Sequence, residues 1–329
     1  MFFGARLEPL TTKGHRGTQG LHRRILFHPA INRFPCASLC TPVPSVVKVL
    51  SAQLKIVAVP VMRHEQTQHD AIRAYYHTLF SAWGHQHWWP AQSRFEMIVG
   101  AYLTQNTSWT NVEKALGNLR KARILTINGI RRTPRRRLEQ LIRPAGYFRQ
   151  KAQRLKMFVR FLDRRYGGSF ERMFAQPTAE LRDELLGLNG VGPETADSIL
   201  LYAGNHPVFV VDAYTRRILE RHQILSSTST YDEIRQLFEQ ALGESTPPKQ
   251  SLDGAPAAVA VQIGAGESVV RPLGSSHRPS RVSRAERTAL VQMFNEMHGL
   301  IVGVGKTYCL KSQPRCDQCP LQKFLPEAK

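Results

Sequence analysis

The sequence predicts an all-α fold, because apolar residues recur at helical spacing and no stretch alternates apolar and polar residues over the length of a strand. In the clearest segments the apolar side chains fall at i, i+3, i+4 and i+7, which places them on one face of a helix. These segments are 95–103, 152–162 and 290–301. Each is expected to be an amphipathic helix that buries its apolar face.

Shorter helices are expected between these segments, and helical character begins near Ala71. The shorter candidates span 110–120, 134–143, 178–187, 194–204, 212–222 and 230–242. With 329 residues the chain is long enough for one large domain or two modest ones that share a core.

Two parts of the chain are expected to stand apart from this helical domain. Residues 1–61 hold many basic residues and the single acid Glu8, and they are interpreted as disordered or as preceding a true start at Met62. A transit peptide or a DNA-binding arm has the same composition. Residues 245–283 are rich in Pro, Gly, Ser and Ala and predict a disordered insertion. The domain itself is therefore expected at 62–244 and 284–329.

The charge balance favours a polyanionic partner. The chain has 45 Lys and Arg against 25 Asp and Glu, a formal net charge of +20. Nucleic acid is the first candidate and an anionic membrane surface the second, whereas a merely basic surface is the plain alternative. The basic run RRTPRRR at 131–137 is either a solvated surface loop or a phosphate contact. No apolar run approaches the roughly 18–20 residues that span a bilayer.

A glycine-containing turn joins two of the expected helices in LNGVGPETAD, residues 188–197. Gly190 and Gly192 are both expected to adopt positive φ and to allow a partner to approach the backbone. Pro193 suits the first position of the next helix, where its missing N–H costs nothing. The free N–H groups and the positive dipole end of that helix make a site for phosphate.

Asp212 follows the apolar run 208–211 and opens the helix in FVVDAYTRRILERH. A carboxylate in this place is either a simple N-cap or a functional group that the hairpin helps to position. The residues alone leave both interpretations open.

The hairpin and VDAYTRR together resemble the helix–hairpin–helix superfamily of DNA glycosylases, the endonuclease III family. GYFRQKAQRLKMF (146–158) and FEMIVGAYLTQNTSWTNVEKAL (95–116) add matches in the right order. The resemblance covers about residues 66–325, apart from the insertion, and implies two helical lobes with the active site in the cleft between them. It implies that Asp212 is the catalytic carboxylate and that Gln105 fills the hole left in the duplex. The hairpin residues implied to hold DNA are Asn189, Gly190, Val191, Gly192 and Thr195.

The implied reaction cuts the N-glycosidic bond of a base that has left the stack, through a cationic, oxocarbenium-like sugar. A carboxylate beside this sugar stabilises the charge and can orient the attacking water. Bifunctional members of the family carry a hairpin lysine that forms a Schiff base, and Glu194 occupies that place here. A monofunctional enzyme with weak or absent lyase activity is therefore expected. Glu194 itself is a candidate second acid or base, or simply a first-turn helix acid.

The stretch HQHWWPAQSRFEM points to the substrate. With LTQNT and the hairpin glutamate it resembles the bacterial 3-methyladenine glycosylases of endonuclease III type. The resemblance implies that Trp88, Trp89 and Pro90 meet the extruded base, with Trp109 nearby and Lys306 contributed by the last helix. Stacking on indole suits a positively charged methylated purine. The plain alternative is that these aromatic residues belong to the core.

Three cysteines close the chain at the spacing that begins the family's iron–sulfur motif. Cys309, Cys316 and Cys319 match, but Leu325 stands in the fourth place. A [4Fe–4S] cluster with a substitute ligand, a zinc site completed by a histidine such as His298, and a loop without metal all remain open. The expected chemistry itself needs no cofactor. The odd total of five cysteines does not indicate a secreted disulfide framework.

The sequence therefore predicts a monomeric base-excision glycosylase for alkylated purines that acts on double-stranded DNA. An endonuclease III-like glycosylase and lyase for oxidised pyrimidines, using another lysine, is the first alternative. A non-catalytic DNA-binding hairpin protein is the second. The bacterial cytoplasm is the expected location, with import into an organelle as the alternative for the basic N-terminus.

Overall fold

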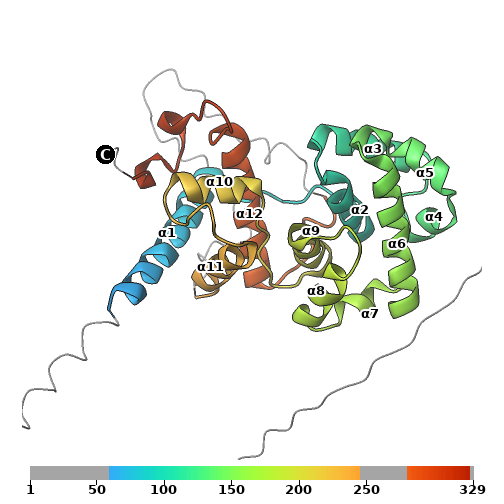
Figure 1. Cartoon of the computed structure of the whole chain (residues 1–329), viewed down its shortest axis with the longest axis horizontal. Helices are drawn as coiled ribbons and strands as arrows, with labels where there is room; N and C mark the ends of the chain where they lie inside the picture. The colour runs from blue at the N-terminus through green and yellow to red at the C-terminus, as the bar shows by residue number, and fades with distance from the viewer. Residues whose placement is uncertain (1–58, 245–279, 327–329) are drawn as a thin grey trace, which may run out of the picture. The chain divides into compact units, whose positions relative to one another are not determined.

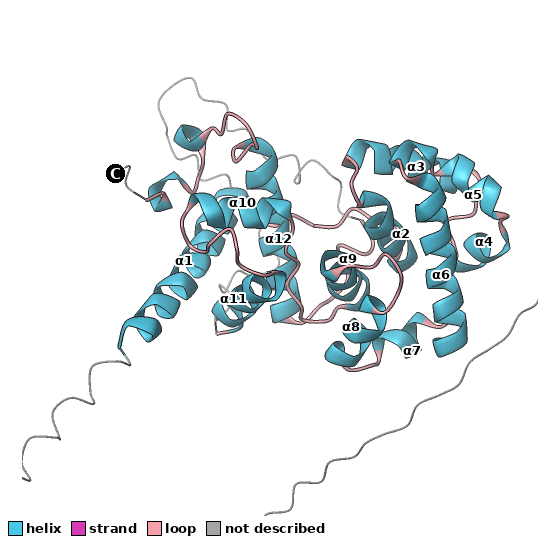
Figure 2. Cartoon of the chain, in the orientation of Figure 1, coloured by secondary structure: helices cyan, strands magenta, loops and turns pink. Residues whose placement is uncertain are grey.

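The computed structural model describes residues 59–244 and 280–326, with side chains from residue 66 onward. Within these ranges every regular element is helical (Figure 2), which confirms the predicted fold class. The helices are α1 (Val59–Trp83), α2 (Arg94–Thr104), α3 (Trp109–Lys121), α4 (Ile127–Arg132), α5 (Arg135–Leu141), α6 (Phe148–Tyr166), α7 (Phe170–Phe174), α8 (Thr178–Leu186), α9 (Pro193–Ser198), α10 (Ala213–Arg221), α11 (Tyr231–Gly243) and α12 (Ala289–Thr307). None of these described helices is both long enough and apolar enough to cross a membrane.

The expected helices are present, with two differences. The expected helix 194–204 consists of α9 and a wider π-helical segment, η2 (Ile199–Gly204). The run 131–137 is not a loop, because it covers the end of α4 and the start of α5. Arg131 in this run pairs with Asp163 of α6. Part of the run therefore fastens α4 to α6 instead of being free for phosphate.

The two segments expected to be disordered lie mostly outside the described residues. Helix α1 begins at Val59, so the expected boundary at residue 61 falls inside a helix. Residues 280–283 are also described, and they form a turn in which Ser280 and Ser283 are buried. The backbone N–H of Ser280 donates to Ser283 Oγ at 2.8 Å, and the N–H of Ser283 donates to Ser280 Oγ at 3.0 Å. The ordered domain therefore resumes before residue 284.

The helices form two groups that correspond to the expected lobes (Figure 1). One group, here called the terminal lobe, contains α1, α10, α11 and α12, which pack on one another although they come from both ends of the domain. The other group, the hairpin lobe, runs continuously from α2 to η2, and in it α2 packs on η2 and on α6. Contacts between α12 and η2 join the two lobes.

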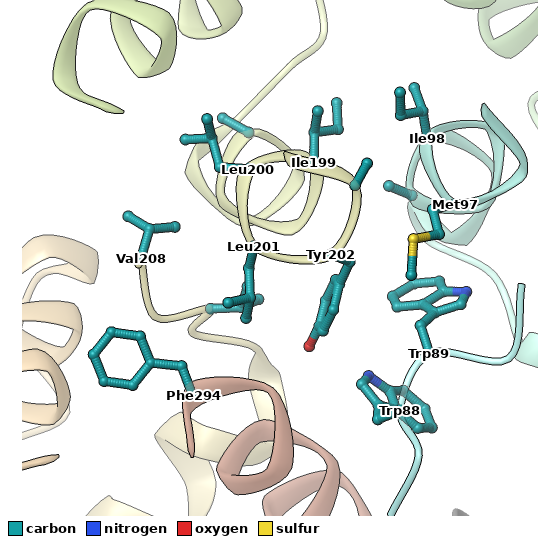
Figure 3. Packing of buried hydrophobic residues seen from close by; sticks show 14 of the residues in the cluster. Trp88, Trp89, Met97, Ile98, Ile199, Leu200, Leu201, Tyr202, Val208 and Phe294 are labelled. Atoms are coloured by element: carbon teal, nitrogen blue, oxygen red, sulfur yellow. The ribbon is translucent and has the colours of Figure 1, made fainter. Parts of the chain in front are cut away.

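The core is apolar and aromatic in both lobes. Phe209 lies on Phe238 with ring centroids 4.1 Å apart, and Phe294 of α12 packs edge-on against Phe209 at 6.0 Å. Figure 3 shows residues of η2 next to Phe294 on one side and next to α2 with Trp89 on the other. Burial of these side chains is the main favourable contribution to holding the lobes together.

One buried cation fixes the end of α2. Lys151 of α6 is 1% exposed, and its Nζ donates to the carbonyls of Leu103 at 2.9 Å and Ala145 at 2.8 Å. Burial and, to a lesser degree, the nearby charge of Arg154 lower the pKa of Lys151 to about 8. These two bonds satisfy carbonyls that the helix end leaves open, and they set the position of the loop after α2.

Candidate active site

A single cleft of about 1020 Å³ collects most of the residues that the sequence singled out. It is lined by side chains of both lobes, in agreement with the implied location of the active site. The predicted residues in its lining are Trp88, Trp89, Gln105, Trp109, Gly192, Glu194, Thr195, Asp212 and Lys306. Pro90, Asn189, Gly190 and Val191 do not line it, so for Pro90 the expected contact with the base finds no support here.

The two hairpin glycines differ in conformation. Gly190 has φ +80°, and a Cβ atom at this position would overlap the guanidinium of Arg154. Gly192 has φ −96° and is the N-cap of α9, and a Cβ atom added there would meet nothing within 4 Å. The expectation of positive φ is therefore right for Gly190 and wrong for Gly192. Gly192 instead leaves open space in front of the helix N-terminus, next to Pro193 at its first position.

Gln105 ties the end of α2 to the hairpin. Its Nε2 donates to the carbonyl of Gly190 and to Thr195 Oγ1, both at 2.9 Å. Its Oε1 accepts a 2.6 Å hydrogen bond from Nη1 of Arg154. Without DNA the Gln105 side chain is thus held within the protein, and its implied insertion into the duplex stays a prediction. Arg154 lies in α6, and no sequence pattern had singled it out.

Asp212 is both the N-cap of α10 and a residue of the cleft, and its catalytic role stays a prediction. Its Oδ1 accepts hydrogen bonds from the backbone N–H of Thr215 at 2.8 Å and from Thr215 Oγ1 at 2.9 Å, which caps α10. Its Oδ2 lies 3.5 Å from Nε2 of His298. Burial raises the pKa of Asp212, but His298 and the Thr215 hydrogen bonds outweigh burial and hold the pKa below its usual value. Asp212 is therefore ionised at neutral pH.

Glu194 stands in the first turn of α9 with its carboxyl on the cleft. No hydrogen bond or ion pair with another described residue engages this carboxyl. The surrounding protein and the negative charge of Asp212 raise the pKa of Glu194, while His298 opposes the shift. The residue as a whole is exposed to solvent at the cleft. The cleft therefore holds two carboxyl groups whose pKa values are displaced in opposite directions, the pattern of an acid beside a permanently charged group.

An aromatic wall and two basic side chains, those of Arg154 and Lys306, complete the cleft. Trp88 and Trp89 are each 7% exposed, and Trp89 meets Trp109 edge-on at 5.3 Å. Nζ of Lys306 lies 5.6 Å from the centre of the Trp88 ring. Burial lowers the pKa of Lys306, whereas the charges of Asp212 and Glu113 oppose this shift. The tryptophans are thus core aromatics and cleft residues at once.

The three cysteines line a separate small cavity of about 20 Å³, together with Leu325. His298 lies in the active-site cleft beside Asp212 and does not line the cavity of the three cysteines, so this placement gives no support to a zinc site completed by His298. In the described part of the chain no three His, Cys, Asp or Glu residues are placed to hold a metal ion. Leu325 offers no ligand atom for the fourth iron of a cluster. The residues do not fit a cluster with four protein ligands, and no step of the chemistry is assigned to one.

The comparison with known families and proteins agrees with this geometry. Residues 99–244 match the family of HhH-GPD superfamily base excision DNA repair proteins. The chain is 37% identical to MJ1434 of Methanocaldococcus jannaschii, named as a DNA repair glycosylase, over 79% of this chain and 98% of that protein. It is 25% identical to endonuclease III-like protein 1 of Bos taurus, over 73% of this chain and 61% of that protein.

Solved structures give the same result. The 3-methyladenine DNA glycosylase MagIII of H. pylori, bound to 1,N6-ethenoadenine, superposes with a TM-score of 0.53 at 28% identity, over 73% of this chain and 97% of that one. An endonuclease III–DNA covalent intermediate also superposes with a TM-score of 0.53, at 19% identity, over 80% of this chain and 96% of that one, and this shows the shared fold. The chain therefore belongs to the HhH-GPD superfamily of base excision DNA repair proteins and is an endonuclease III-like DNA glycosylase.

Proposed function

We propose that the chain is a monofunctional glycosylase that hydrolyses the N-glycosidic bond of an alkylated purine such as 3-methyladenine. The observation that carries this proposal is the carboxyl group of Glu194 in the cleft, in the hairpin place that the lysine of bifunctional relatives takes. A carboxyl cannot form an imine with the sugar. The similarity to the H. pylori 3-methyladenine glycosylase supports the same substrate class.

Asp212 supplies the main electrostatic stabilisation. When the bond between sugar and base breaks, positive charge develops on the sugar. An ionised carboxylate in a partly desolvated cleft stabilises this charge more than it would in water. Asp212 lines the cleft, and its Oδ2 is available for this role because Thr215 engages only Oδ1. Oδ2 also orients and deprotonates the water that attacks the sugar carbon.

Glu194 serves as the second acid in this proposal. Its raised pKa keeps the proton on the carboxyl to a higher pH than usual. A protonated carboxyl can donate to the departing base as the bond breaks. An alkylated, cationic purine leaves readily without this help, so Glu194 contributes less for such a base than Asp212 does.

The cleft receives the extruded base against Trp88, Trp89 and Trp109, where stacking suits a purine. A cationic base is also attracted by the ionised carboxylate of Asp212. The lowered pKa of Lys306 reduces the repulsion that a second cation would meet there. The partner is double-stranded DNA, which the net charge of +20 attracts, and the chain acts as a monomer.

The test is base release from duplexes that carry alkylated, oxidised or deaminated bases, with wild type and Asp212→Asn. We expect release of 3-methyladenine by the wild type and a loss of about 10²–10³-fold in rate for the variant, the range for losing one electrostatic stabiliser. Unchanged release by Asp212→Asn would show that the assignment is wrong and would favour a non-catalytic hairpin protein. Release of oxidised pyrimidines alone would refute the proposed substrate class.

A second candidate function is a bifunctional glycosylase and lyase, and the observation that favours it is the amine of Lys306 in the cleft. Its lowered pKa increases the fraction of neutral, nucleophilic amine. Borohydride reduction on a duplex with an abasic site separates the two candidates. A covalent adduct that disappears in Lys306→Met would establish the lyase, and no adduct is expected if the enzyme is monofunctional.

A further inference from the structure

Oδ2 of Asp212, the oxygen that Thr215 does not engage, lies next to the side chain of His298. Nε2 of His298 lies 3.5 Å from Oδ2, at the outer limit of a hydrogen bond. The two side chains are 5% and 11% exposed. Nε2 has no hydrogen-bond partner among the described residues and no solvent contact. A buried polar nitrogen without a hydrogen-bond partner is unusual in a native structure. Its position next to Oδ2 of Asp212 therefore calls for an explanation.

The other ring nitrogen of His298 is occupied by Tyr202. The Tyr202 hydroxyl and Nδ1 of His298 form a hydrogen bond across the contact between η2 and α12. Tyr202 is 2% exposed, and burial and then the charge of Asp212 raise its pKa well above the usual value. The phenol therefore keeps its O–H and can donate it to Nδ1.

This bond decides where the imidazole carries its hydrogen. When Nδ1 accepts from Tyr202, the neutral ring holds its only N–H at Nε2. An imidazolium ring carries an N–H at both nitrogens. In either state Nε2 carries a hydrogen, so a possible donor lies 3.5 Å from Oδ2 of Asp212.

Packing fixes the plane of the ring. Trp88 and Phe209 both meet His298 edge-on, with centroids at 6.5 Å and 6.3 Å. Figure 3 shows Tyr202 projecting from η2 on the side of Trp88 and Trp89. These residues come from η2, the segment before α2 and the segment after η2, whereas His298 lies in α12. The orientation of the His298 ring therefore depends on how the two lobes pack.

We propose that His298, oriented by Tyr202, is the positioning residue for Asp212 and holds its Oδ2 toward the sugar of the flipped nucleotide. The inference rests on the proposed role of Asp212. Because Nε2 of His298 has no solvent contact, its assigned role acts through Asp212 and not through direct contact with the substrate. A hydrogen bond from Nε2 to Oδ2 forms in this proposal when the damaged nucleotide fills the cleft and excludes water, since such bonds strengthen in a desolvated site.

Three variants test this assignment on duplex DNA methylated with dimethyl sulfate, which carries 3-methyladenine. His298→Leu removes the donor at similar size, His298→Asn keeps a donor amide, and Tyr202→Phe keeps the ring but frees Nδ1. The readouts are the single-turnover release rate, the Kd for an uncleavable abasic-site duplex, and the melting temperature. Rate and Kd separate positioning of Asp212 from DNA binding, and the melting temperature reports the fold.

We expect His298→Leu to lower the single-turnover rate about 100-fold and Tyr202→Phe about 10-fold, the range in which second-layer positioning contacts act. The Kd should stay within about twofold, and His298→Asn should recover about tenfold of the loss at an equal melting temperature. If the rates of His298→Leu and His298→Asn fall in parallel with their melting temperatures, His298 is a purely structural residue and the inference is overturned. If Asp212→Asn is inactive while His298→Leu matches wild type, the inference alone fails. If Asp212→Asn is active, the proposed function fails as well.

Discussion

The hairpin offers a sharp test in Gly190→Ala, because two costs coincide at this residue. Its φ of +80° lies in the left-handed region, which disfavours any residue with a Cβ. The new Cβ would also overlap the guanidinium of Arg154. Arg154 would have to move away, and its 2.6 Å hydrogen bond to Gln105 would be lost.

The two costs can be added from their separate physical origins. Placing alanine in a left-handed conformation costs about 1–2 kcal/mol. Losing a hydrogen bond to a charged group costs about 1.5–3 kcal/mol. The free energy of unfolding should therefore fall by about 3–5 kcal/mol in Gly190→Ala. In a domain of this size that corresponds to a drop of roughly 6–20 °C in melting temperature.

Gly192→Ala is the matched control in the same turn. Gly192 has φ −96° and open space around it, so alanine fits without strain. The weaker N-cap and the reduced entropy of the unfolded chain oppose each other, and the melting temperature should stay within about 2 °C. Its Kd for duplex DNA should rise about tenfold, a loss of about 1.4 kcal/mol, if the open space receives the DNA backbone.

Differential scanning calorimetry and fluorescence anisotropy measure both variants on the same preparations. If Gly190→Ala melts within about 2 °C of wild type, the left-handed strain and the contact with Arg154 are not what this glycine provides. If both glycine variants bind DNA like the wild type, the hairpin is not the surface that holds the backbone.

Three further predictions follow from the cleft and its supports. Because the pKa of Glu194 is raised, its carboxyl stabilises the fold fully below the ordinary glutamate pKa and loses this contribution as pH rises through the pKa of the folded state. Glu194→Gln should therefore have a higher melting temperature than wild type at pH 7–8, and the difference in melting temperature should vanish toward about pH 4. Lys151→Met leaves two buried carbonyls without a donor and should lower the free energy of urea unfolding by about 2–4 kcal/mol, and a loss below about 1 kcal/mol would contradict its role at the end of α2. Gly305→Ala would drive a Cβ into the ring of Tyr214, so α10 should shift and excision should slow at least about tenfold for a cost of about 1–3 kcal/mol in stability. Equal activity of Gly305→Ala and wild type would show that the packing of α10 on α12 does not position the cleft.

The sequence predicted the long helices because their apolar faces repeat over several turns, as in α2, α6 and α12. It missed α4 and α7, which have 6 and 5 residues and are too short to show a repeat. Their clearest signals are the N-caps Thr126 and Ser169, whose side chains accept from the first turn. The widening into the π-helical segment η2 follows no local sequence pattern either.

The cleft was predictable where residues stand in a motif and not where the fold alone brings them together. Asp212 and Glu194 follow recognisable local sequences. Tyr202 and His298 lie 96 residues apart, and the structure makes them neighbours through the contact of η2 with α12. His298 is a candidate metal ligand in the sequence, but its side chain lies beside Asp212 in the cleft and not beside the cysteines. The face of α12 on which a side chain lies, and not its distance along the chain, determines which residues it contacts.

The divided use of the Asp212 side chain restricts which amino acids position 212 can accept. The N-terminus of α10 is best capped by a short side chain with an acceptor oxygen, which serine, threonine, asparagine and aspartate provide. The proposed chemistry of the cleft requires a negative charge, which aspartate and glutamate provide. Glutamate is not among the favoured capping residues, and the other three capping residues carry no charge. Aspartate alone meets both demands, so folding and chemistry independently select the same residue.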